Sequence, residues 1–114
     1  MLANLLFHGE YAAYVAAFFS GLFLCNSVPH LVSGLQGMPF PTPFANPHGV
    51  GDSSPLVNVL WGFANLVAGV VLLSRHPVLL SLNPALLALL IGVLVIAVFS
   101  SLHFGKVQKN KLQK

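Results

Sequence analysis

The spacing of the charged residues is the feature that most constrains how this chain can fold. Seven of its 114 residues carry a charge, and they leave three uncharged stretches, at 11–51, 53–74 and 76–105. About 20 apolar residues in a helix cross the hydrocarbon core of a bilayer. A charge at the bilayer centre costs about 2.5–3.5 kcal/mol on insertion scales, and each stretch avoids that cost. The spacing therefore predicts an integral membrane protein.

Composition excludes most other classes of protein. Charged residues make up 6% of the chain and hydrophobic residues 56%, whereas about 25% of the residues in a soluble domain are charged. A soluble enzyme, a secreted disulfide scaffold and a disordered tail are excluded, because the chain lacks the polar groups that cover a soluble surface. Cys25 is the only cysteine, so no disulfide within the chain is expected.

The expected fold is an all-α integral membrane protein, with a single transmembrane domain over residues 1–114. Helices are expected because lipid cannot satisfy an open sheet edge, and because the apolar runs are continuous rather than alternating. Three transmembrane helices are predicted, at about 11–35, 56–73 and 84–104. The sequence Asp-Ser-Ser-Pro at 52–55 predicts the start of the second helix, since capping residues precede a proline.

The segment 36–55, between the first two predicted helices, is rich in proline and glycine and cannot form a regular helix. One interpretation is a loop folded back over the helix ends, with Phe40 and Phe44 at the membrane interface. Another is a re-entrant or pocket-forming segment, which is tolerated only where protein or water covers its backbone. The sequence leaves both interpretations open.

The lysines predict the orientation in the membrane. Four of the five basic residues lie at the end of the chain, at Lys106, Lys109, Lys111 and Lys114. The positive-inside rule places this basic tail, residues 105–114, in the cytoplasm, where its lysines contact anionic headgroups at the membrane surface. With three spans, the N-terminus then lies outside. Nucleic acid is not an expected partner, because no aromatic residues are interleaved with the lysines.

Small residues recur on one face of each predicted helix, which lets another helix approach closely. The positions predicted for helix packing are Ala13, Ala17, Gly21, Gly62, Gly69, Ala88 and Gly92. Such faces suit packing within the chain, a homo-oligomer or contact with other membrane subunits. The remaining expected partners are membrane lipids.

Polar residues within the predicted spans form the first candidate site. An unpaired amide buried in an apolar environment costs about 2–7 kcal/mol, so each of these residues needs a partner. Hydrogen bonds between helices are one interpretation, and the lining of a ligand or ion path is the other. The residues assigned to the path are Asn26, His30, Asn58, Trp61, Asn65 and His103.

A second candidate site follows from the alternating direction of the spans, which brings distant residues to one side of the membrane. His30, His48, Asp52 and His103 share the inner side and carry donors that suit a transition metal or a proton relay. None of them has a diagnostic ligand spacing, and histidine also suits a membrane interface for its apolar ring and polar tip. A transition metal is therefore an alternative, and no other cofactor is expected.

A longer run, residues 30–73, contains the motifs PFPTPFA, GxGxSSP and NVLWGxxN. In these motifs the chain resembles small bacterial inner-membrane proteins. The resemblance implies a location in the bacterial inner (plasma) membrane, and it implies no activity.

Three hypotheses for the function remain open at this point. The first is a structural or accessory subunit, a helix-packing partner in a membrane complex. The second is a homo-oligomeric transporter or channel for small molecules or ions. The third is a metal- or ligand-binding membrane protein that uses the inner histidines and Asp52. No set of nucleophile, base and acid stands out, so catalytic residues are not predicted.

Overall fold

The computed structural model describes residues 2–113, and the side chains from Gly9 to Gln113. Its elements follow in the order α1 (Leu2–Leu35), β1 (Phe40–Pro41), β2 (Asp52–Ser53), α2 (Pro55–Arg75) and α3 (Pro84–Leu112). The two short strands pair antiparallel, with Phe40 opposite Ser53. Three long helices thus dominate the described chain, as the sequence predicted. The two strands pair with each other within the loop between α1 and α2.

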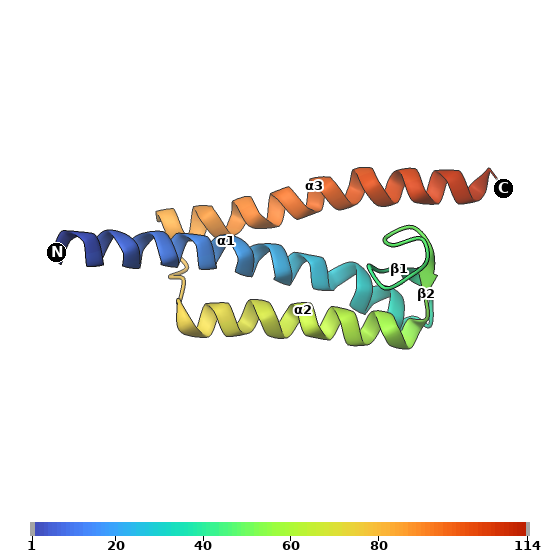
Figure 1. Cartoon of the computed structure of the whole chain (residues 1–114), viewed down its shortest axis with the longest axis horizontal. Helices are drawn as coiled ribbons and strands as arrows, with labels where there is room; N and C mark the ends of the chain where they lie inside the picture. The colour runs from blue at the N-terminus through green and yellow to red at the C-terminus, as the bar shows by residue number, and fades with distance from the viewer. Residues whose placement is uncertain (1, 114) are drawn as a thin grey trace.

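The helix α1 lies in the middle of the bundle, between α2 and α3 (Figure 1). Its contacts with these two helices are the main contacts between elements. The bundle is elongated, with principal extents of 59 × 26 × 24 Å. The loop that carries β1 and β2 lies at the end of the bundle where α1 ends and α2 begins, on the side of the C-terminal half of α3 (Figure 1).

Three segments are long and apolar enough to cross a membrane: Gly9–Leu35, Pro55–Arg75 and Pro84–Leu112. Large apolar side chains cover their outward faces, and α3 exposes several in succession, among them Leu87, Leu90, Ile91, Leu94 and Val98. Large exposed apolar surfaces mark regions that contact a membrane or another protein.

The observed helices extend beyond the predicted ones. The first begins at Leu2 rather than at residue 11, and the second exceeds its predicted range by one residue at the start and two at the end. The largest difference is in α3, which continues through most of the predicted tail to Leu112 instead of ending at 104. Lysine and glutamine are good helix formers, and no proline follows Phe104 to end the helix.

Capping residues define the starts of α2 and α3. The Ser54 side chain accepts a hydrogen bond from the backbone N–H of Val57 at 3.2 Å, and Pro55 occupies the first helical position. Asn83 accepts in the same way from Leu86 N–H at 3.0 Å, ahead of Pro84. Each cap satisfies a backbone donor that the first turn of a helix leaves free. The predicted start of the second helix is therefore confirmed to within one residue.

Small residues bring α1 and α3 close together. A Cβ added at Gly92 would overlap the carbonyl oxygen of Phe18, and one added at Gly21 would overlap that of Leu89. Ala17, one turn before Gly21, is buried. The two backbones thus meet where neither helix carries a bulky side chain, which is the usual arrangement of close helix pairs in membranes.

The contact between α1 and α2 uses glycine in the same way. A Cβ at Gly62 would lie 2.8 Å from Leu31 Cγ, and one at Gly69 would lie 2.6 Å from Leu24 Cγ. Two other positions predicted for packing, Ala13 and Ala88, are half-buried. Most of the predicted small-residue positions are therefore occupied by contacts within the chain.

Candidate functional site

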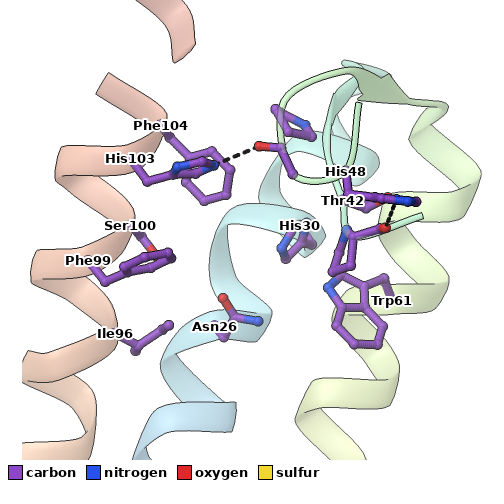
Figure 2. Close-up of a pocket in the computed structure, with 13 residues that line it drawn as sticks. Asn26, His30, Thr42, His48, Trp61, Ile96, Phe99, Ser100, His103 and Phe104 are labelled. Atoms are coloured by element: carbon purple, nitrogen blue, oxygen red, sulfur yellow. Dashed lines mark hydrogen bonds between the residues drawn. The ribbon is translucent and has the colours of Figure 1, made fainter. Parts of the chain in front are cut away.

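A pocket of about 410 Å³ lies at the loop end of the bundle. Its walls come from α1, the loop between α1 and α2, α2, and the C-terminal half of α3 (Figure 2). Four of the six residues predicted for a ligand or ion path line it: Asn26, His30, Trp61 and His103. The volume falls within the range of about 300–1,000 Å³ that is usual for small-molecule sites.

A row of polar contacts along the interface of α1 and α2 leads to the pocket. Ser20 Oγ donates to the Gly69 carbonyl oxygen at 3.0 Å, and Asn26 Nδ2 donates to Asn65 Oδ1 at 3.0 Å. The third contact joins the ring of His30 to the amide of Asn58. Asn58 and Asn65 were predicted to line the path, but they do not line the pocket. They lie behind its lining and form hydrogen bonds with His30 and Asn26, which do line it.

The hydrogen bonds of Asn58 determine the state of the His30 ring. The two hydrogens of Asn58 Nδ2 are shared among the carbonyl oxygens of Phe40, Ser53 and Ser54, which lie 2.9–3.2 Å from the nitrogen. Because carbonyls only accept, the amide nitrogen must face them, and Asn58 Oδ1 must face His30. His30 Nδ1, 2.8 Å from that oxygen, is therefore the donor. In the neutral ring, His30 Nε2 then carries the lone pair and is an acceptor.

The second asparagine pair leaves another acceptor at the pocket. Asn65 Nδ2 donates to the Trp61 carbonyl oxygen at 2.8 Å, which turns Asn65 Oδ1 towards Asn26. Asn26 Nδ2 donates in this pair, so Asn26 Oδ1 takes no part in the contact with Asn65. Within the described residues, Asn26 Oδ1 has no hydrogen-bond partner.

The indole N–H of Trp61 is a hydrogen-bond donor without an acceptor among the described residues. Trp61 Nε1 is buried and has no hydrogen-bond partner in the part of the chain that the structure describes. The ring lies at 6.4 Å from the His30 ring, centroid to centroid, and Phe44 covers it edge-on at 5.0 Å. A buried N–H without an acceptor costs about 1–3 kcal/mol, so this donor needs an explanation.

Aromatic side chains of α3 form the opposite wall (Figure 2). Phe99 stacks on the His103 ring at 5.5 Å, and Phe104 lies 4.7 Å from Phe40 of β1. His103 Nε2 donates to the carbonyl oxygen of Gly49 at 2.7 Å and so ties the loop to α3. Ser100 adds a hydroxyl to the lining. None of the described residues that line the pocket is Asp, Glu, Lys or Arg.

The four candidate metal ligands are each engaged elsewhere. His30 binds Asn58, His103 binds Gly49, and His48 Nδ1 donates to a loop carbonyl oxygen at 2.7 Å. Asp52 forms an exposed ion pair with Lys111. Among residues 9–113 the structure brings no three His, Cys, Asp or Glu side chains into a group that could hold a metal.

The lysines predicted for the membrane surface lie on the last turns of α3. Lys106 and Lys109 are exposed, and Lys111 Nζ lies 2.7 Å from Asp52 Oδ1. Lys114 lies outside the described residues. The contact of Lys111 with Asp52 is a second link between α3 and the loop, next to that of His103.

Sequence reasoning missed much of the pocket wall. Phe99, Ser100, Phe104 and Thr42 line the pocket, but none of them was among the residues predicted for a site. A signal exists for the α3 residues, because Ile96, Phe99, Ser100, His103 and Phe104 recur at helical spacings of three and four. Thr42 had no comparable signal. Its burial depends on the hydroxyl contact with Ser53, 2.5 Å away across the loop.

Comparisons with known proteins identify no relative. No protein-family model, no curated protein and no solved structure matches the chain. Inference about function therefore depends on the chemistry of the pocket. The pocket combines an apolar, aromatic lining with a few directed polar atoms, which suits recognition of a small uncharged molecule.

Proposed function

We propose that this chain is a small membrane protein that binds an uncharged, largely apolar molecule in the pocket between its loop and its three helices. The observation that carries the proposal is the Trp61 N–H. Trp61 lines an aromatic-walled pocket, and its buried N–H lacks an acceptor among the described residues. A bound molecule with an oxygen beside the indole would supply the acceptor once a small rotation of the ring brings the N–H to the pocket surface, and its apolar part would fill the space beside Phe99 and Phe104.

Insertion into a bilayer is part of the same proposal. The length and apolar surface of the three helices support it, and the positive-inside rule favours a cytoplasmic C-terminus and an N-terminus outside. The resemblance of residues 30–73 favours the bacterial inner membrane. The pocket would then lie towards the cytoplasmic side, where an apolar molecule dissolved in the lipid could enter from the bilayer.

Ligand binding has more support than the other two hypotheses. The small residues that suggested a homo-oligomer or a partner subunit, such as Gly21, Gly69 and Gly92, already contact helices of the same chain. They therefore give no separate support to an accessory role. A transporter or channel needs a path to both sides, whereas the polar row beyond Asn26 consists of side chains bonded to each other and to backbone.

Native mass spectrometry of the protein in mild detergent, followed by extraction of bound small molecules, tests the proposal. We expect a stoichiometric uncharged molecule to remain with the unmodified chain. The Ser100→Phe variant should lose it, because Ser100 lines the pocket and a phenyl ring would fill the space. The neighbouring Ser101→Phe variant is the matched control, since Ser101 is exposed and does not line the pocket.

The two variants differ only in which side of α3 carries the added ring. Loss of the bound mass in Ser100→Phe and its retention in Ser101→Phe would support the proposal. Equal retention in both variants would show that the molecule binds elsewhere, and absence of any retained molecule from the unmodified chain would count against ligand binding.

A further inference from the structure

The polar atoms of the pocket restrict which uncharged molecule it recognises. This inference rests on the proposed function, and it concerns the chemical class of the ligand. Two atoms matter most: the lone pair of His30 Nε2 and the N–H of Trp61. Both residues line the pocket, and their rings lie 6.4 Å apart, one on α1 and the other on α2. Figure 2 shows the nitrogen edge of Trp61 on the side of its ring nearer His30.

The direction of each hydrogen bond follows from the neighbours. His30 Nδ1 is occupied as the donor to Asn58, so the ring can only accept at Nε2 while it is neutral. The indole nitrogen of Trp61 can only donate. A ligand that satisfies both atoms must therefore donate one hydrogen bond and accept another. An ether or an ester only accepts, and an amine protonated at neutral pH only donates. A hydroxyl group does both.

The walls decide which kind of hydroxyl compound fits. The pocket is lined by the aromatic side chains of Trp61, Phe99 and Phe104, and Phe40 packs against Phe104 beside it. Aromatic rings pack against such side chains edge-on or offset, for about 0.5–1.5 kcal/mol beyond the area they bury. A phenol combines such a ring with a hydroxyl that is neutral at pH 7, because phenols ionise near pH 10. The ligand is expected to be neutral because the described lining residues include no Asp, Glu, Lys or Arg that could pair with a charge.

We propose that the pocket binds a phenol, whose hydroxyl donates to His30 Nε2 and, after a small rotation of the indole, accepts from Trp61 Nε1–H, while its ring lies beside the aromatic side chains of α3. Asn58 acts as a positioning residue, because it holds the His30 ring in the state that accepts. Binding, without any change to the bound molecule, is the extent of the proposal.

The chain contains one tryptophan, so its fluorescence reports on the proposed site alone. The probes are 4-bromophenol and 4-bromoanisole, which share a ring and a bromine that quenches tryptophan on contact. They differ in the hydroxyl hydrogen, which a methyl group replaces in the anisole. The protein is held in nanodiscs of uncharged phospholipid, and the concentration of each probe in the lipid is measured with protein-free discs. Unbrominated phenol and anisole serve as competitors.

We expect 4-bromophenol to quench Trp61 saturably, with a half-quenching concentration about fivefold to tenfold below that of 4-bromoanisole, as the loss of one hydrogen bond predicts. Phenol should restore the fluorescence more effectively than anisole. In a His30→Leu variant the two brominated probes should become equivalent. Saturable quenching by 4-bromoanisole in that variant shows that the pocket persists, and the comparison in the unmodified chain does not depend on the variant.

Two results would overturn the inference in distinguishable ways. If both probes quench the unmodified chain saturably and with equal strength, the pocket binds apolar rings but does not discriminate by the hydroxyl. The proposal that the pocket binds an uncharged apolar molecule then stands, and the proposal of a phenol fails. If neither probe gives saturable, competitor-sensitive quenching, and Ser100→Phe retains the same extracted molecule as Ser101→Phe, then the pocket is not a binding site and both proposals fail.

Discussion

His30 Nδ1 on α1 lies 2.8 Å from Asn58 Oδ1 on α2, and the amide nitrogen of the same asparagine donates to carbonyl oxygens at both ends of the loop between α1 and α2. Asn58 is fully buried and His30 is 2% exposed. One side chain thus joins α1, α2 and the loop. It also determines which ring nitrogen of His30 is left to face the pocket, so the stability of the fold and the chemistry of the site depend on the same contact.

Replacement of Asn58 by leucine should destabilise the protein. The change removes about three hydrogen bonds, one accepted from His30 and two donated by the amide, and at about 0.6 kcal/mol for each between transmembrane helices the free energy of unfolding should fall by about 2 kcal/mol. Unfolding by sodium dodecyl sulfate in mixed micelles, followed by circular dichroism, measures the change. Ser74→Ala is the control, because the exposed Ser74 hydroxyl bonds only to a carbonyl of its own helix. Equal stability of the two variants would contradict the role given to Asn58.

The sequence was sufficient to predict the elements that local patterns determine. Uncharged runs predict the three helices, and capping residues before proline predict the start of α2. The sharing of one face by Asn26 and His30 follows from their spacing of four residues. These features depend on neighbours a few residues away, and the structure contains all of them.

The parts that sequence reasoning missed depend on contacts between distant segments. His103 and Gly49 are 54 residues apart in sequence, and their hydrogen bond brings the loop against α3 and closes one side of the pocket. The alternation of predicted spans placed His48 and Asp52 on the same side as His30, but that reasoning sets only the side of the membrane, not the distance. The loop instead turns His48 to its own backbone and Asp52 to Lys111.

Substitution of Gly92 by alanine should separate α1 from α3. The added Cβ would overlap the Phe18 carbonyl oxygen, which is backbone and cannot move without shifting the helix. Overpacking of this kind costs about 1–3 kcal/mol, so the free energy of unfolding should decrease by that amount in the same titration. Gly105→Ala in the same helix is the control. Nothing lies within 4 Å of its added Cβ, and the higher helix propensity of alanine should leave stability unchanged or raised by up to about 1 kcal/mol. A loss as large in Gly105→Ala would assign the effect to the substitution itself rather than to the contact.

Replacement of His103 by alanine should loosen the loop. The hydrogen bond to the Gly49 carbonyl oxygen is one of two polar links between the loop and α3 among the described residues, and the other is the Lys111–Asp52 ion pair. Its loss, at about 1 kcal/mol, should speed amide hydrogen exchange in residues 42–51 about fivefold, with little change in α1. Exchange is measured by mass spectrometry on the protein in nanodiscs. Lys111→Ala is the comparison, and it should have a smaller effect because its ion pair with Asp52 is exposed. A larger effect of Lys111→Ala would mean that the ion pair, not His103, holds the loop.

The proposed orientation predicts which ends of the bundle a membrane-impermeant thiol reagent can reach. Ser81 lies in the exposed connection between α2 and α3, and Gln113 follows the last turn of α3. In intact bacterial cells that express the protein in the inner membrane, with the outer membrane opened, Ser81→Cys should be labelled because the positive-inside rule leaves this connection outside. Gln113→Cys should be labelled only after the inner membrane is also opened.

The unmodified chain supplies the background for this measurement, since its single cysteine, Cys25, lies within the Gly9–Leu35 span. Labelling of Gln113→Cys but not Ser81→Cys in intact cells would reverse the orientation and place the pocket on the outer side. Labelling of both positions in intact cells would contradict a membrane crossing by α3, the one helix between them. The pattern therefore decides, apart from any assay of binding, on which side of the membrane a lipid-dissolved ligand would meet His30 and Trp61.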